Sequence, residues 1–201
     1  MYKVVKRMID FILALFAAAI LSPVFLLTAA AVKADSKGPV FFVQKRVGKD
    51  KKLFDMYKFR TMRTDTPHDM PTHLLKSPDA YITNVGKFLR KTSLDELPQL
   101  FNIISGDMSI VGPRPALWNQ DDLVAERDKY GANDIRPGLT GWAQVNGRDE
   151  LEIDVKAAYD GEYAKKISPI FDLKCIIKTA VQVIRSEGVV EGGTGILAET
   201  K

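Results

Sequence analysis

The longest run of apolar and small residues lies near the start of the chain, where no charged residue occurs between Phe11 and Val32. This length suits a helix that crosses a lipid bilayer, which takes about 20 apolar residues. Ser22 and Pro23 stand in the middle of the run, however, and a proline inside a helix removes a backbone hydrogen bond and bends the helix. Each half is then too short to cross a hydrocarbon core of about 30 Å alone.

Basic residues flank both ends of this apolar run: Lys3, Lys6, Arg7, Lys33 and Lys37. The positive-inside tendency therefore gives no direction across a membrane, as expected if both ends stay on the cytoplasmic side. These residues leave three interpretations open: a re-entrant helix-break-helix, a kinked spanning helix and a cleaved signal peptide. If the helix breaks inside a membrane, the Ser22 hydroxyl is a candidate partner for the backbone groups that the break frees.

After this run the pattern predicts two short strands and a series of helices. Alternating apolar positions indicate strands at residues 39–44 and 53–60, joined by a turn at 48–50. Helical spacing predicts helices at residues 84–91, 96–104, 120–130 and 155–165, of which the third is acidic and exposed. Residues 64–79 are rich in proline, aspartate and threonine, which indicates a loop.

A last helix is predicted at residues 170–185, where apolar residues share one face and lysines fall mostly on the other. Packing against the domain core is the usual fate of such a helix, and contact with a membrane surface is a second interpretation. Cys175 lies among the apolar residues, so we expect a small core or membrane-facing residue and not a nucleophile. As the only cysteine, it excludes an internal disulfide.

The net charge and its distribution along the chain limit the classes of partner that the protein is expected to bind. The net charge is +4, and eight basic residues against two acidic ones fall between Lys45 and Arg63. Such a stretch suits anionic headgroups or nucleotide phosphates. Nucleic acid is disfavoured because no zinc-finger, RNP-type or KH-type pattern accompanies the charge. His68 and His73 have no cysteine nearby, so no transition-metal site is expected there.

The most informative candidate for chemistry is the pair of adjacent carboxylates, Asp95 and Glu96. An ionised carboxylate can attack phosphorus while guanidinium groups hold the phosphate oxygens. The alternative is that Asp95 caps a helix, because Pro98 would then lie in the first turn, where a proline costs little. A capping box from Ser93 to Glu96 is disfavoured, because it puts Pro98 at the fifth helical position.

Several cations are candidates for phosphate binding. Arg114 stands between two prolines on a stiff backbone, which favours phosphate binding over packing. Arg136 and Arg148 fit the same argument less sharply. Lys58 and Arg60 share one polar face of the second strand, where they suit substrate phosphates or lipid headgroups. Trp142 and Gln144 suit contact with a substrate or packing in the core equally well.

Five ordered motifs resemble the bacterial sugar transferase family, and specifically its small monotopic phosphoglycosyl transferases. They are the Ser-Pro of the apolar segment, Tyr-Lys-Phe-Arg-Thr-Met at 57–62, the acidic stretch at 93–102, the Gly-Pro-Arg-Pro region at 106–115, and Arg-Pro-Gly-Leu-Thr-Gly with Gln-Val-Asn-Gly-Arg at 136–148. The resemblance covers nearly the whole chain. It implies transfer of a sugar-1-phosphate from a nucleotide-sugar donor, expected to be a UDP-sugar, to polyprenyl (undecaprenyl) phosphate.

The resemblance also implies roles for particular residues. Asp95 is the expected nucleophile and Glu96 its partner, Mg²⁺ is the expected cofactor with Asp95 as a ligand, and Ser22 and Pro23 break a re-entrant anchor. The residues expected to bind substrate are Lys58, Arg60, Arg90, Arg114, Arg136, Gln144 and Arg148. A covalent aspartyl-phosphosugar is the expected intermediate. A one-step transferase, in which Asp95 only holds magnesium, stays open.

The expected architecture is an α+β fold: a mostly helical, small cytoplasmic domain with a short β-hairpin, anchored by an N-terminal re-entrant helix-break-helix. The expected boundaries are 1–36 for the anchor, 37–187 for the catalytic domain and 188–201 for a flexible tail. The expected location is the cytoplasmic face of the inner membrane, with donor, polyprenyl phosphate acceptor and membrane lipid as partners. The identity of the sugar, the pathway and a homodimeric state stay open. A non-catalytic scaffold that docks on lipid would need neither the adjacent carboxylates nor the proline-flanked arginine.

Overall fold

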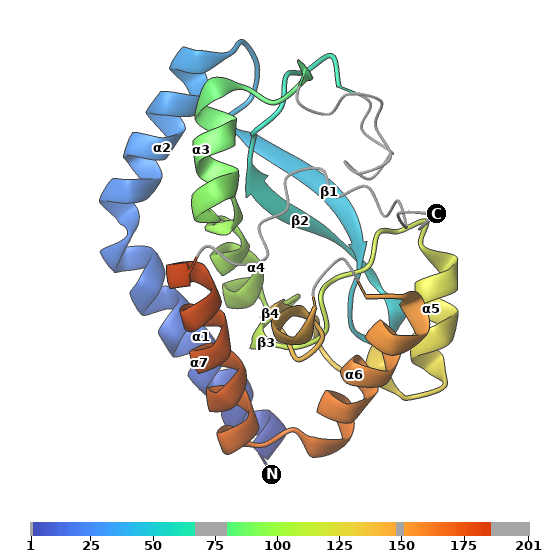
Figure 1. The fold of residues 1–201 in the computed structure, drawn as a ribbon. Helices are drawn as coiled ribbons and strands as arrows, with labels where there is room; N and C mark the ends of the chain where they lie inside the picture. Colours follow the sequence, from blue (N-terminus) through green and yellow to red (C-terminus); the bar gives the residue numbers. More distant parts are fainter. Residues whose placement is uncertain (1, 67–79, 148–150, 186–201) are drawn as a thin grey trace.

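The computed structural model describes residues 2–66, 80–147 and 151–185 of the 201-residue chain. Two long helices, α1 (Tyr2–Ile20) and α2 (Ser22–Asp35), run along one side of the molecule, and a β-hairpin passes through its middle (Figure 1). The last helix, α7 (Pro169–Arg185), lies beside the start of α1. The predicted α+β class, mostly helical with a short hairpin, is confirmed.

The two N-terminal helices bend by 63° at a one-residue break. Pro23 lies in the first turn of α2, where its missing N–H needs no partner. The Ser22 hydroxyl donates a hydrogen bond of 2.8 Å to the carbonyl of Ala19, so it partners a backbone group at the break as the sequence suggests. Within the described ranges no single helix is long and apolar enough to cross a membrane, and α1 and α2 meet that test only as a pair.

The hairpin pairs β1 (Phe41–Val47) with β2 (Leu53–Phe59) in antiparallel register, with Phe41 opposite Phe59. A 3₁₀ turn, η1 (Lys49–Lys51), joins the strands, and Asp50 within it takes left-handed backbone angles. Both strands and the turn overlap their predicted positions, because alternation of apolar residues and the glycine at the turn are both local signals. β1 begins two residues later and ends three residues later than predicted.

A second pair of strands, β3 (Ser109–Val111) and β4 (Gly138–Thr140), is parallel and is missing from the sequence prediction. Three residues are too few to show an alternating pattern. The two backbones approach so closely that a Cβ at Gly138 would lie 2.1 Å from the Gly112 nitrogen. These glycines are therefore required by backbone packing, whatever else their loops contact.

The remaining helices lie close to their predicted positions: α3 (Asn84–Thr92), α4 (Gln99–Ser105), α5 (Asp121–Asp128) and α6 (Ile153–Lys166). Short 3₁₀ turns occur at η4 (Leu94–Glu96), η5 (Ala132–Asp134) and η6 (Gln144–Asn146). The start predicted at residue 96 is wrong, because Pro98 precedes the first residue of α4. The exposed character predicted for α5 is also incomplete, because Arg127 is buried. The predicted tail, most of the loop at 64–79 and both histidines lie outside the described residues.

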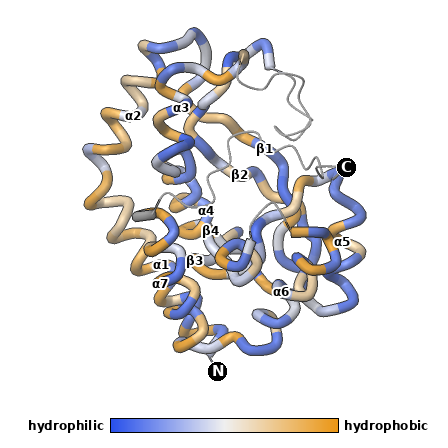
Figure 2. The backbone as a smooth tube through the Cα atoms, viewed as in Figure 1, coloured by the Kyte–Doolittle hydropathy of each residue, from blue (hydrophilic) through white to orange (hydrophobic). Residues whose placement is uncertain are grey.

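The two N-terminal helices share the core of the domain that follows them. Ala14 of α1 is buried against Leu100 and Ile103 of α4, and Val32 of α2 is buried against Phe59 of β2. The other side of the pair carries a run of exposed apolar residues, visible as hydrophobic stretches of the tube along α1 and α2 (Figure 2). One face of the bent pair therefore packs on the domain, and the other face is available to contact an apolar environment outside the domain.

The last helix also divides its apolar residues between two environments. Cys175 is fully buried, which confirms the prediction of a core residue, and burial raises the pKa of its thiol to about 11. Exposed apolar side chains follow another face: Ile170, Leu173, Ile176, Ile177, Val181 and Val183. Packing against the core is thus confirmed for one face, and membrane contact stays a prediction for the exposed one.

Candidate active site

The adjacent carboxylates sit in a sharp turn between two helices. Ser93, with φ of 56°, ends α3 in the left-handed region, and η4 follows at once with Asp95 and Glu96. The residue at the cap position of α4 is Pro98, and no side chain forms a capping hydrogen bond there. Capping of α4 by Asp95 is therefore wrong. The turn instead holds two carboxylates on a short segment of backbone between two helices.

Two separate segments bring cations into contact with the carboxylates of this turn. Lys58 of β2 places its Nζ 2.7 Å from Glu96 Oε1 and 3.7 Å from Asp95 Oδ2. Arg114, on the loop after β3, places Nη2 3.2 Å from the same Glu96 oxygen. The group is therefore assembled from three separate parts of the chain. β2 supplies the lysine, η4 supplies the carboxylates, and the loop after β3 supplies the arginine.

The two carboxyl groups have opposite electrostatic environments. Burial raises the pKa of Asp95, and the neighbouring Glu96 raises it further, while Lys58 and two arginines oppose the shift. Burial would also raise the pKa of Glu96, but direct contacts with Lys58 and Arg114 hold the pKa of that carboxyl well below its usual range. Glu96 is therefore an ionised partner that fixes two cations.

Asp95 differs from Glu96 in its hydrogen bonding. Its side chain is 12% exposed and accepts no hydrogen bond from the described residues, and the Lys58 Nζ lies 3.7 Å from its Oδ2. A carboxylate held in this way keeps its oxygens available for a reacting atom or a metal ion. Glu96 Oε1, in contrast, accepts hydrogen bonds from both Lys58 and Arg114.

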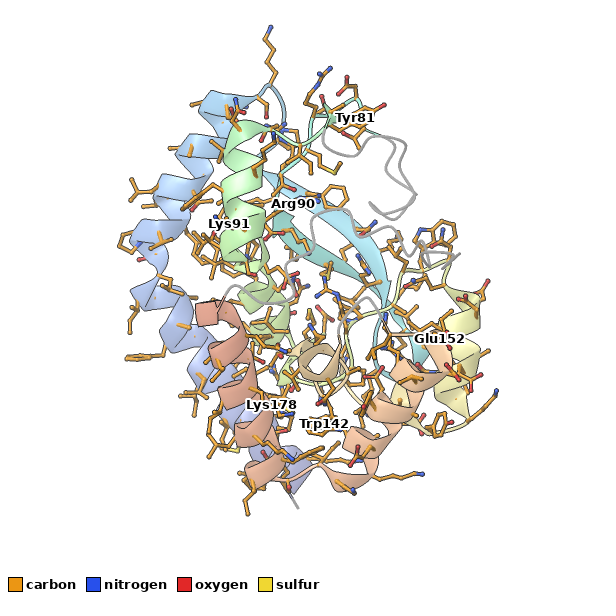
Figure 3. The ribbon with its side chains drawn as sticks, in the orientation of Figure 1. Tyr81, Arg90, Lys91, Trp142, Glu152 and Lys178 are labelled. Carbon is orange, nitrogen blue, oxygen red and sulfur yellow. The ribbon has the colours of Figure 1, made fainter. Side chains whose placement is uncertain are left out.

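Arg90 belongs to the same group, because its positive charge lowers the pKa of Asp95. It lies on α3 and donates from Nε to the Thr61 hydroxyl at 2.9 Å. Figure 3 shows Arg90 in the upper half of the molecule, well separated from Trp142 and Lys178. The structure thus brings Lys58, Arg90 and Arg114 of the predicted set to the carboxylates.

Arg60 does not join this group. Its guanidinium is buried and donates to the carbonyls of Lys37 and Ser36, at 2.7 and 2.8 Å, beyond the end of α2. This is the position in which a cation satisfies the unpaired carbonyls of a helix C-terminus. We therefore remove Arg60 from the substrate-binding set. The sequence placed it with Lys58 because alternate residues of a strand share a face, but the chain leaves the strand at Phe59.

Gln144 and Trp142 pack in the interior. Gln144 is buried and donates from Nε2 to the Leu139 carbonyl at 3.3 Å. The Trp142 ring lies 4.9 Å from the Phe171 ring, and its Nε1 donates to Glu162. These contacts favour the core interpretation for both residues. Arg136 lies in a different cavity, described below, and Arg148 lies outside the described residues.

A buried ion pair that the sequence did not reveal supports the Arg114 loop. Arg127 Nη2 donates to Asp160 Oδ2 at 2.6 Å and to the backbone carbonyl of Arg114 at 3.0 Å. Both paired side chains are at most 5% exposed. Charge on an amphipathic helix usually faces water, so neither residue could be distinguished from a surface charge by pattern alone.

A magnesium ion at this site would need ligands from a substrate as well as from the protein. The described residues contain no group of three or more histidine, cysteine or carboxylate side chains that could hold a metal. Mg²⁺ is commonly bound by one or two carboxylates together with substrate phosphates. Asp95 suits this kind of site, because its oxygens accept no hydrogen bond from the described residues. Glu96 fits it less well, because its Oε1 is committed to two cations.

Comparison with known proteins assigns the chain to a family. Residues 1–186 match the model of the bacterial sugar transferase family. The sugar transferase EpsL of Bacillus subtilis is 39% identical over 186 residues, which cover 92% of this chain and 90% of that protein. Two relatives that carry a substrate in their names are longer, and the chain covers less than half of each.

The first is the UDP-glucose:undecaprenyl-phosphate glucose-1-phosphate transferase of Xanthomonas campestris, 42% identical over 190 residues, or 91% of this chain and 39% of that protein. The second is the undecaprenyl-phosphate galactose phosphotransferase of Salmonella typhimurium, 36% identical over 197 residues, or 91% of this chain and 41% of that protein. The match to the family model over nearly the whole length, together with these identities, shows that the chain belongs to the bacterial sugar transferase family.

Proposed function

We propose that this protein transfers a sugar-1-phosphate from a UDP-sugar to polyprenyl (undecaprenyl) phosphate, giving polyprenyl-diphosphate sugar and UMP. The observation that carries the proposal is Asp95: a buried carboxylate without hydrogen bonds from the described residues, on which the charges of Lys58, Arg90 and Arg114 act. The names of the relatives support the reaction class. Because those names include both glucose and galactose, they leave the sugar open.

The reaction would proceed in two displacements at one phosphorus. In the first, an Asp95 oxygen attacks the sugar-bearing β-phosphorus, the bond from that phosphorus to the bridging oxygen breaks, and UMP leaves. In the second, an oxygen of polyprenyl phosphate attacks the same phosphorus and releases the Asp95 carboxylate. Lys58, Arg90 and Arg114 would offset the phosphate charge that otherwise repels the nucleophile.

Two features of the site suit these steps. A carboxylate with a raised pKa is a stronger base and a better nucleophile once ionised, and burial raises the pKa of Asp95. Glu96 keeps Lys58 and Arg114 beside it without blocking its oxygens. Mg²⁺, held by Asp95 and the substrate phosphates, would supply further positive charge.

Intact-protein mass spectrometry tests this proposal against the one-step alternative. The protein is mixed with single UDP-sugars in the absence of acceptor. A mass increase equal to one phosphosugar is expected with the true donor, and the adduct should disappear when polyprenyl phosphate is added. A donor that supports transfer but never leaves an adduct, even in rapid quench, would favour direct transfer with Asp95 acting only on the metal.

We also propose that α1 and α2 form a re-entrant anchor in the cytoplasmic face of the inner membrane. The 63° bend, the exposed apolar side of the pair and the basic residues at both ends support this topology. Both helix ends would then lie on the same side as the catalytic carboxylates.

Replacing Ser22 and Pro23 with two alanines should straighten the anchor and move the N-terminus to the opposite side of the membrane. Alanine restores the backbone donor that proline lacks and favours a continuous helix. The measurement is labelling of a cysteine in an N-terminal tag by an impermeant reagent on intact cells. The unaltered protein should stay unlabelled and the variant should be labelled, with transfer impaired. Labelling of the unaltered protein would mean that the segment spans.

Arg114→Lys should lower kcat/KM for the UDP-sugar by about ten- to a hundredfold although the charge is kept. A guanidinium can contact Glu96 and two phosphate oxygens at once, whereas an ammonium is a point charge. The kinetics should be measured in detergent or nanodiscs, with thermal unfolding in parallel. Arg63→Lys is the matched control, because the side chain of that arginine is exposed and, among the described residues, pairs with the neighbouring Asp65. Near-normal kinetics for Arg114→Lys would assign the residue to loop structure.

A further inference from the structure

A charged cavity of about 140 Å³ lies where the start of α1 meets β3 and the loop before β4. It shares no lining residue with the group around Asp95. Five basic side chains line it: Lys3, Lys6, Arg7, Lys49 and Arg136. Two acidic side chains, Asp10 and Asp134, are also present, so the lining as a whole carries an excess of positive charge.

Lys6 pairs with two carboxylates, Asp10 of the cavity lining and Asp172 of α7. Lys6 Nζ lies 2.8 Å from Asp172 and 3.6 Å from Asp10. Asp10 also accepts a hydrogen bond of 2.6 Å from the Ser109 hydroxyl, and Asp172 accepts one from Tyr163. One lysine and several hydroxyl groups therefore contact these two carboxylates, and the other cations of the cavity do not pair with them. Asp134, the other acidic side chain of the lining, pairs with no cation among the described residues, so it offsets one of the remaining positive charges.

Lys49 forms an exposed ion pair of 3.5 Å with Asp50, and none of the other three cations pairs with a carboxylate of the described residues. Arg7 donates to the carbonyls of Ile103 and Ile104 at 2.6 and 2.9 Å, so no carboxylate cancels its charge. Arg136 donates from Nε to the Gly106 carbonyl at 2.7 Å, which orients the guanidinium, and its Nη atoms have no partner among the described residues. Lys3 is exposed and has no partner within the described ranges. An anion entering the cavity would meet this surplus.

The surroundings of the cavity suit an anion attached to an apolar tail. Val4 and Met8, which are 70% and 61% exposed, flank the cavity residues on α1. Ile170, 82% exposed, lies in the first turn of α7, and Tyr2 and Lys6 contact Asp172 in the same turn. Exposed apolar side chains thus lie on two helices beside the cations. A soluble anion would leave this apolar surface in water, whereas a lipid would cover it.

We propose that this cavity binds the phosphate of an anionic phospholipid headgroup at the foot of the anchor, with the acyl chains along the exposed faces of α1 and α7. The inference rests on the membrane anchoring proposed above. The ligand is distinct from the reacting acceptor, because the acceptor phosphate has to reach Asp95, which contributes nothing to this cavity. Arg136, predicted to bind substrate, is thereby assigned to lipid phosphate.

The test uses the full chain in neutral detergent, titrated with short-chain phosphatidylglycerol while thermal unfolding is followed. A ligand that binds the folded state raises the unfolding temperature in proportion to the logarithm of its concentration above Kd. Short-chain phosphatidylcholine and inorganic phosphate are titrated separately. We expect phosphatidylglycerol to bind at least about tenfold more tightly than either.

Two double variants locate the effect. Lys3→Gln with Arg136→Gln should weaken phosphatidylglycerol binding by about tenfold or more. Lys3→Gln with Lys49→Gln changes only exposed side chains, so it tests the cavity even if loss of Arg136 disturbs the fold, and it should weaken binding in the same direction. Lys45→Gln with Lys87→Gln removes two exposed charges elsewhere and should leave binding unchanged.

Equal binding of phosphatidylglycerol and phosphatidylcholine, or no loss in either cavity variant, would overturn the inference. Equal stabilisation by inorganic phosphate would overturn the lipid assignment and indicate a site for soluble phosphate. Equal losses of phosphatidylglycerol binding in the control variant would mean that binding depends on the overall charge of the protein and not on the cavity. Transfer activity, assayed separately with UDP-sugars, decides the proposed function, so the two can fail independently.

Discussion

Asp95→Asn should abolish transfer, lowering kcat/KM by more than about a thousandfold, while the protein stays folded and membrane-bound. An amide has nearly the shape of a carboxylate but is a poor nucleophile at phosphorus. The side chain accepts no hydrogen bond from the described residues, and burial already raises its pKa, so loss of the charge should cost little stability. The measurement is steady-state transfer together with the mass of the phosphosugar adduct, which should be absent.

Asp55→Asn is the matched control, because this exposed carboxylate on β2 has no side-chain partner in the described parts of the chain. It should transfer at the normal rate. If Asp95→Asn retained more than a few per cent of activity after deamidation had been excluded, Asp95 would not be the nucleophile. A loss of activity accompanied by unfolding would leave the assignment to the mass measurement on the folded fraction.

Arg127→Ala should destabilise the fold by about 3–5 kcal/mol, the usual cost of leaving one member of a buried ion pair without its partner. Asp160, which is 1% exposed and whose pKa burial already raises, would then have lost its guanidinium partner in the interior. Turnover should fall as well, because Arg127 donates the hydrogen bond that fixes the carbonyl of Arg114. Thermal unfolding and kcat/KM measure the two effects.

A double variant separates stability from positioning. Arg127→Met with Asp160→Leu replaces the pair with apolar side chains and should recover most of the stability, since such exchanges are often neutral. Turnover should stay low because the Arg114 carbonyl still lacks its donor. Recovery of both would restrict the pair to a structural role. Lys51→Ala, which breaks an exposed ion pair with Asp128, is the control and should change stability by less than about 1 kcal/mol.

The parts of the fold that could be predicted depend on local signals. A proline bends a helix wherever it occurs in the interior, so Pro23 predicts the break without knowledge of the rest of the chain. The hairpin and the longer helices likewise follow from spacing within a few residues. β3 and β4 carry no such signal, because their pairing comes from the approach of Gly112 to Gly138 across distant segments.

The chemistry of the site could be predicted from the sequence, but the set of residues that form it could be predicted less well. Asp95, Glu96 and Arg114 stand out because their residue types are costly to place in a rigid turn or loop without a purpose. Arg60 and Arg136 carry the same charge in similar motifs, yet one closes the end of α2 and the other lines a separate cavity. Which arginine faces which partner is decided by tertiary contacts that the motif does not encode.

The shared core of α1, α2 and the domain has a consequence for how the molecule is made. Ala14 and Val32 complete the packing around Ile103 and Phe59, so the core of the domain is not closed until α1 and α2 have docked. Under the re-entrant topology proposed above, insertion of α1 and α2 at the membrane and completion of this core would be coupled. Removing the first 36 residues to obtain a water-soluble enzyme would leave an open core, and a detergent or nanodisc preparation of the whole chain is the rational route to the active form.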